Sequence, residues 1–150
     1  MRLTVGVAII VIASGVVARG QSLQERALCA KQAKIAFEED SSSDDVKNLS
    51  RSKPISSDYQ SHYNAKLNKC FVLMEGRSMD MTTKEFFNGA QLTDAFERRI
   101  FATYGWTSQA GKKYWEVPPR TCELTPTSHE TINCSSKEEF DAFVAKYMEQ

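Results

Sequence analysis

The stretch Cys122-Glu-Leu-Thr-Pro-Thr-Ser-His-Glu-Thr-Ile-Asn-Cys134 predicts a β-hairpin that turns around Ser128. Folded in this way, the two arms pair residue by residue, with Glu123 opposite Asn133, Leu124 opposite Ile132 and Thr125 opposite Thr131. Directly opposed residues of antiparallel strands have β-carbons about 4.5–5.5 Å apart, which is close to the spacing that a disulfide needs. We therefore expect a disulfide between Cys122 and Cys134.

The other two cysteines, Cys29 and Cys70, are then expected to form the second of two disulfides. Four cysteines allow three pairings, and the hairpin favours this one. No two cysteines are closer than twelve residues, and Lys66 and Asn133 occupy the i+4 positions after the two histidines, so no metal site is predicted. A catalytic Cys–His pair, whose members can be distant in the chain, is the alternative that spacing leaves open.

The amino terminus has the pattern of an export signal. Arg2 precedes Val5–Ala18, a run of fourteen residues without a charge, which is shorter than the roughly 20 apolar residues of a membrane-spanning helix. We expect residues 1–20 to be a signal peptide, cleaved after Gly20 or after Ala18; an uncleaved anchor is the alternative. The mature protein is therefore predicted to be periplasmic or secreted, with no membrane attachment, in a compartment where disulfides persist.

The composition of the chain limits its partners. Its 150 residues include 19 Lys or Arg and 19 Asp or Glu, and loss of Arg2 and Arg19 with the leader leaves a net charge of −2. Nucleic acids and anionic membranes normally require a clear excess of basic side chains, so neither is an expected partner. The expected partner is a protein or a small molecule of the cell envelope.

The mature region, residues 21–150, is predicted to be a single domain that begins with a helix. Residues 23–39 are rich in Ala, Glu, Lys and Gln, and an apolar stripe is expected to face the core, formed by Leu23, Ala27, Ala30, Ala33 and Phe37. Residues 40–58 are Ser- and Asp-rich and are predicted to be a polar loop. Their acidic residues lack the spacing of a calcium-binding loop.

Strands are predicted in the central part of the chain. Residues 69–74 are an apolar run, residues 100–107 are rich in β-branched and aromatic side chains, and residues 113–117 end at Pro118. A short helix is predicted after Thr82-Thr-Lys-Glu85, which has the form of a capping box. The same form at Ser136-Lys-Glu-Glu139 predicts a terminal helix with a stripe of Phe140, Phe143, Val144, Tyr147 and Met148.

Together these elements predict an α+β fold. It has an amino-terminal helix, four to five mostly antiparallel strands in one curved sheet, a carboxy-terminal helix and two disulfides, with both helices on one face of the sheet.

Several motifs of the mature chain carry a resemblance: Tyr59-Gln-Ser-His-Tyr-Asn64, Leu67-Asn-Lys-Cys-Phe71, Tyr114-Trp-Glu-Val-Pro-Pro119 and Glu139-Phe-Asp-Ala-Phe143. With these motifs the chain resembles a group of small exported proteobacterial proteins to which no activity is assigned. The resemblance covers most of the mature chain; it implies a bacterial periplasmic setting and supplies no catalytic residue. In a eukaryotic setting, Asn48-Leu-Ser50 and Asn133-Cys-Ser135 would instead be glycosylation sequons.

The sequence favours a binding role over an enzymatic one. It contains no phosphate-binding Gly loop, no Gly-x-Ser-x-Gly and no His-Glu-x-x-His, so no cofactor and no catalytic set is predicted. Adjacent Tyr114 and Trp115 would point to opposite sides of a strand, which leaves one of them for a partner or a covering element. With His62 and Tyr63 they are the candidate binding residues.

Two alternatives remain at this point. His62 could be the base of a small hydrolase or transferase, although no acidic residue lies near it in the chain. By analogy with other small disulfide-bonded exported domains, the protein could also inhibit an extracellular hydrolase.

Overall fold

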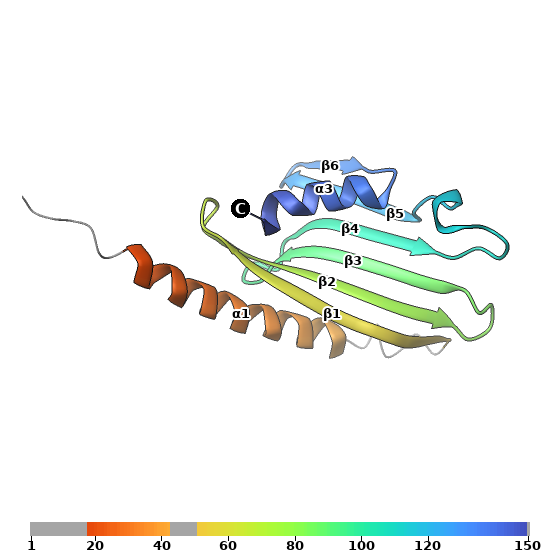
Figure 1. The fold of residues 1–150 in the computed structure, drawn as a ribbon, viewed down its shortest axis with the longest axis horizontal. Helices are drawn as coiled ribbons and strands as arrows, with labels where there is room; N and C mark the ends of the chain where they lie inside the picture. Colours follow the sequence, from red (N-terminus) through yellow and green to blue (C-terminus); the bar gives the residue numbers. More distant parts are fainter. Residues whose placement is uncertain (1–17, 43–50, 150) are drawn as a thin grey trace, which may run out of the picture.

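The computed structural model describes residues 18–42 and 51–149, and Figure 1 shows them as one six-stranded antiparallel sheet with two long helices. The strands pair in chain order from β1 to β6. In sequence the elements are α1 (Ala18–Ser42), β1 (Ser52–Asn64), β2 (Lys69–Asp80), β3 (Phe86–Asp94), β4 (Ile100–Thr107), the 3-10 turn η1 (Tyr114–Glu116), β5 (Thr121–Thr127), β6 (Glu130–Asn133) and α3 (Lys137–Met148).

The α+β class, the single antiparallel sheet and the two disulfides are confirmed, although the sheet has six strands instead of four or five. Two strands of the sheet were not predicted, β1 and β3, whereas the strand predicted at residues 113–117 does not form. The prediction of a loop over residues 40–58 is wrong at both ends: residues 40–42 end α1, and residues 52–58 belong to β1. Most of β1 is exposed, so its sequence has no alternation of apolar and polar residues that would have indicated a strand.

The two helices pack on opposite faces of the sheet, not on one face as predicted. Successive residues of a strand point to opposite faces, and β2 shows this directly. Val72 and Met74 belong to the cluster that packs under α1, whereas Phe71 belongs to the cluster that packs under α3. Figure 1 shows α1 running alongside β1 and α3 lying over β4 and β5.

The buried face of α1 differs from the predicted stripe. Cys29, Ala33 and Ala36 are buried, whereas Leu23 is 68% exposed, and Ala27 and Ala30 are exposed as well. The buried positions have i, i+4, i+7 spacing, as predicted. Of the predicted stripe, Ala33 is buried and Phe37 is partly buried against the same cluster, so the predicted face overlaps the observed one only in part. An Ala-rich helix has little difference between its faces, and the disulfide from Cys29 selects the face that packs. Of the predicted leader, only residues 18–20 are described, as the start of α1.

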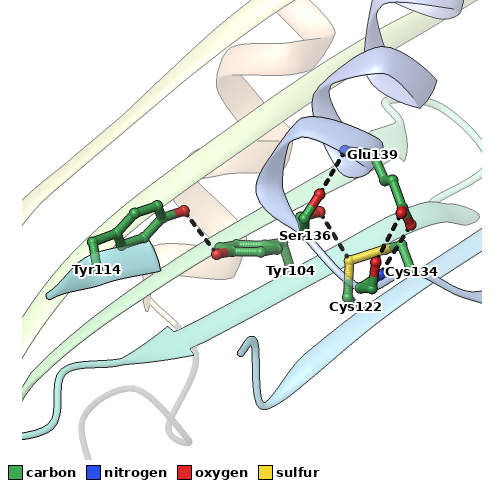
Figure 2. The surroundings of a disulfide bond; sticks show 7 residues. Tyr104, Tyr114, Cys122, Cys134, Ser136 and Glu139 are labelled. Atoms are coloured by element: carbon green, nitrogen blue, oxygen red, sulfur yellow. Dashed lines mark hydrogen bonds between the residues drawn. A yellow bond between two sulfur atoms is a disulfide. The ribbon is translucent and has the colours of Figure 1, made fainter. Parts of the chain in front are cut away.

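The terminal helix α3 begins and packs as predicted. Figure 2 shows its first turn, where the Ser136 Oγ accepts a hydrogen bond from the Glu139 N–H at 3.3 Å. The Glu139 carboxylate accepts bonds from the N–H and hydroxyl of Ser135, which lower the pKa of Glu139. Phe140, Phe143 and Val144 are buried against the sheet.

Both disulfides join the cysteines that the sequence favours. Cys29 on α1 is bonded to Cys70 on β2, and Cys122 is bonded to Cys134, with Cα–Cα distances of 5.3 and 5.0 Å. The hairpin pairs Glu123 with Asn133 and Leu124 with Ile132, as expected. The register then shifts before Thr127, which pairs with Glu130, so the expected pairing of Thr125 with Thr131 is wrong.

Two local predictions are also corrected. Residues 82–85 form no helix; they are in the turn between β2 and β3, where the N–H groups of Thr82 and Thr83 donate to Asp80 Oδ1 at 2.7 and 2.9 Å. These bonds lower the pKa of the Asp80 carboxyl. Residues 113–117 form no strand either, because residues Tyr114–Glu116 make the 3-10 turn η1. The Asp80 side chain, which precedes the capping-box pattern in the chain, holds residues 82–85 in a turn.

Candidate functional site

A row of three glycines crosses the middle of the sheet. Gly76 on β2 pairs directly with Gly89 on β3, and Gly89 pairs with Gly105 on β4. Directly paired residues share one face of an antiparallel sheet, so all three glycines lie on the face that also carries α1; the backbone is open at Gly76, whereas the Phe87 ring covers Gly89 and Gly105. Because α1 packs on β1 and β2, the backbone next to it forms the floor of a groove of about 350 Å³.

Aromatic side chains form the walls of this groove. The Phe87 ring lies over two of the glycines, since a Cβ at Gly89 would be 3.0 Å from one Phe87 ring carbon, and a Cβ at Gly105 would be 3.5 Å from another. On the side of α1, Phe37 stacks on Tyr59 with 4.8 Å between ring centroids. Phe87 lines the groove and is 43% exposed, so part of its ring is accessible to a ligand in the groove.

The polar groups of the groove are few and mostly uncharged. Serines of β1, Gln91 of β3 and Thr103 of β4 contribute hydroxyl and amide groups. Glu75 and Arg77 contribute backbone only, because their side chains alternate to the opposite face, where Arg77 lies over the Phe86 ring. Among the described residues that line the groove, Asp40 is therefore the charged side chain at its rim. This arrangement suits a flat or chain-like apolar group that is neutral or cationic.

The structure does not bring the predicted binding residues together. His62 and Tyr63 are neighbours on β1 and point to opposite faces. The Tyr63 hydroxyl donates to Asn68 Oδ1 at 2.7 Å and lines a second cleft, beside the amino-terminal half of α1. Partial burial and the nearby Glu25 carboxylate raise the pKa of Tyr63.

His62 lies in a third cleft, of about 310 Å³, between β1 and α3. Asp141 of α3 and Glu149, which follows the helix, line the same cleft. The fold therefore places two acidic residues in the cleft of His62, 79 and 87 residues further along the chain. Asp141 is also the ion-pair partner of Lys137.

Tyr114 and Trp115 lie on η1, at the other end of the sheet from the β1–β2 turn. Figure 2 shows the Tyr114 hydroxyl hydrogen-bonded to the Tyr104 hydroxyl, at 3.0 Å. Burial, followed by this contact, raises the pKa of Tyr104 well above its usual range. Trp115 is 76% exposed, with the Lys113 ammonium 5.1 Å from its ring centroid. Tyr114 is also exposed, at 43%, so the expectation that strand alternation exposes only one of the pair is wrong, because the two residues lie on a 3-10 turn.

The glycine groove was not predicted from the sequence, although its three glycines are visible there. Nothing in their spacing, 13 and then 16 residues apart, indicates that they are neighbours until the register of three strands is known. Phe86 and Phe87, the two aromatic residues of β3, lie where the sequence predicts a short helix, so the capping-box pattern conceals this strand.

Within residues 18–42 and 51–149, no three His, Cys, Asp or Glu side chains gather in a way that could hold a metal ion. No helix in this part of the chain combines the length and the hydropathy needed to span a bilayer. Comparison with known proteins finds no matching family model, and neither a curated protein nor a solved structure that is significantly similar.

Proposed function

We propose that this chain is an exported, non-enzymatic binding protein that takes the apolar part of a ligand into the groove over Gly76 and Gly89. The observation that carries the proposal is the open backbone at Gly76 in the groove that Phe37 and Phe87 line, which leaves room for a flat ring or an acyl chain. Asp40 at the rim favours a neutral or cationic ligand over an anionic one.

The proposed location, periplasmic or secreted, rests on the chain's amino terminus and on its cysteines. Residues 1–20 have the composition of a signal peptide, and both cysteine pairs lie within disulfide distance in the folded chain. Disulfides persist in oxidising compartments, so export and the two crosslinks support each other. The resemblance to small exported proteobacterial proteins favours the periplasm.

The test uses the neutral dye N-phenyl-1-naphthylamine, whose fluorescence rises in apolar surroundings, as the probe for the groove. We expect saturable binding to the wild type and loss of binding to Gly76→Val. A Cβ at Gly76 meets nothing closer than the Ser56 carbonyl oxygen at 4.0 Å, so valine fits the backbone while its methyls fill the groove. Replacing a strand glycine that has ordinary backbone angles should raise stability by roughly 0.4–1 kcal/mol.

The matched control is Thr121→Val, on the same face of the sheet but outside the groove. It should bind the dye as the wild type does. If Gly76→Val is folded and binds the dye with unchanged affinity, or if the wild type shows no saturable signal, the groove is not a binding site.

A second candidate function follows from the third cleft. The joint lining by His62, Asp141 and Glu149 favours a hydrolase or transferase in which His62 acts as base and a carboxylate orients the ring. Its test compares hydrolysis of p-nitrophenyl acetate by the wild type and by His62→Gln. A loss of about a hundredfold or more in a saturable rate, which is what general base catalysis contributes, supports this function. Equal rates in the two proteins contradict it.

A further inference from the structure

Three exposed apolar side chains meet at one end of the molecule, away from the glycine groove. Leu28 comes from α1, Leu67 from the β1–β2 turn and Phe96 from the β3–β4 turn, and they are 56%, 48% and 50% exposed. All three line the second cleft, whose volume is about 400 Å³. Apolar side chains that gather from separate segments without being buried are typical of a surface that binds another molecule.

The segments that carry these side chains are firmly tied together. The Cys29–Cys70 disulfide links α1 to β2 beside the cleft, and the Ala95 N–H donates to the Cys70 carbonyl at 2.8 Å. On the helix side, Gln32 Nε2 donates to the Ala95 carbonyl at 3.3 Å. The cleft is therefore formed before any partner arrives, which reduces the entropy that is lost on binding.

Each of the two turns is also fixed by a side chain. The N–H of Leu67 donates to Asn64 Oδ1 at 3.0 Å, and the N–H of Phe96 donates to Asp94 Oδ1 at 2.9 Å. Asn64 and Asp94 are themselves buried, at 0% and 2% exposure. The backbone of Leu67 and Phe96 is therefore held in place, so their side chains stay at the surface.

The charge of the cleft is acidic. Glu25, Asp94 and Glu97 line it together with one ammonium, that of Lys69. Lys69 is already paired with Asp94 and Glu97, with Nζ–O distances of 3.0 and 2.7 Å. Its charge is thus shared by two carboxylates, so an excess of negative charge faces the cleft.

We propose that the second cleft is a docking site for a polypeptide segment of another envelope protein, in which apolar anchor residues are flanked by Lys or Arg. The anchors fill the space between Leu28, Leu67 and Phe96, and the basic residues meet Glu25 and Glu97. The charge complementarity selects a basic partner segment over an acidic one. This site is separate from the glycine groove, so Gly76→Val leaves it unchanged.

The experiment uses the oxidised mature protein and a dye-labelled, capped decapeptide in which three leucines are separated by lysines. Binding is followed by fluorescence anisotropy at low and at high salt. We expect saturable binding that weakens with salt, and at least about tenfold weaker binding to Leu67→Ser and to Phe96→Ser. Both positions are exposed, so these variants should stay folded, which circular dichroism checks. Ile132→Ser, on β6 and equally exposed, is the matched control and should bind as the wild type does.

Several outcomes overturn the proposal. One is equal binding of a peptide with glutamates in place of the lysines; another is unchanged binding of the basic peptide to the Leu67 and Phe96 variants. The proposal is also overturned if the basic peptide shows no saturable binding to the wild type. If the wild type sediments as a dimer and Phe96→Ser sediments as a monomer, the cleft binds a second copy of this chain instead. If the wild type cosediments with zwitterionic vesicles and Phe96→Ser does not, the cleft binds a lipid surface instead.

Discussion

Removing the Cys29–Cys70 disulfide should release α1 from the sheet before the rest of the fold is lost. Among the side chains of α1 that the structure describes, the fully buried ones are the small residues Cys29, Ala33 and Ala36, and Phe37 is partly buried. Noncovalent packing of this helix therefore removes only a modest apolar surface from water. By contrast, α3 buries Phe140, Phe143 and Val144. The attachment of α1 therefore depends on its crosslink far more than the attachment of α3 depends on any single bond.

The magnitude follows from the length of chain that each disulfide closes. Cys29 and Cys70 are 41 residues apart and Cys122 and Cys134 are 12 apart. In the chain-entropy model, these separations correspond to about 4 and about 3 kcal/mol of stabilisation at 25 °C. The double variant Cys29→Ala/Cys70→Ala should accordingly lose more free energy of unfolding than Cys122→Ala/Cys134→Ala, by about 1 kcal/mol.

Two measurements check this prediction. Urea unfolding followed by circular dichroism gives the free energy for the wild type and both double variants. Native-state amide hydrogen exchange then shows whether the helix opens by itself, and we expect the α1 amides of Cys29→Ala/Cys70→Ala to lose protection while those of β3 and β4 keep it. The reasoning is refuted if the hairpin variant is the less stable of the two, or if α1 stays as protected as in the wild type.

Two further predictions concern single side chains. Ser136→Ala removes the acceptor for the Glu139 N–H at the start of α3 and should lower the free energy of unfolding by about 1 kcal/mol in urea titrations; an unchanged midpoint contradicts the cap. Burial tends to raise the pKa of Asp94, but the Glu97 N–H and the Lys69 ammonium outweigh it and hold this pKa below the usual 3.8. A lowered folded-state pKa contributes stability that is present above the unfolded-state value and is lost as the pH falls through the folded-state value. Asp94→Asn should therefore cost about 2 kcal/mol at neutral pH and show a smaller loss of stability than the wild type below about pH 4, in thermal melts across that range; parallel pH profiles contradict this assignment.

Most helices and strands could be predicted because their signals are local. The helix of residues 137–148 has a cap residue and an apolar stripe at helical spacing, and both act within a few residues of the chain. The hairpin from Cys122 to Cys134 is similar, because its short turn brings the two cysteines opposite each other. Local signals also caused the errors: residues 82–85 match a capping box, and a hydrogen-bond acceptor just before them, Asp80, makes them a turn.

The candidate sites depend on contacts between segments that are distant in the chain. His62 obtains its acidic neighbours from α3, and the cleft of Leu28, Leu67 and Phe96 draws on three separate segments. Neither grouping leaves a pattern within a sequence window. Tyr114 and Trp115 were predicted from strand alternation, but they lie on a 3-10 turn, and the fold places Tyr63 on a separate surface.

The amino-acid sequence by itself determined the α+β class, the cysteine pairing, the hairpin and the terminal helix, because these follow from short-range spacing and from capping. Only the tertiary structure decided that the helices lie on opposite faces and that Gly76, Gly89 and Gly105 form one row. The physical reason is strand register: a shift of one residue in the pairing of two of these strands would place their glycines on opposite faces, and register is set by the packing of the whole sheet.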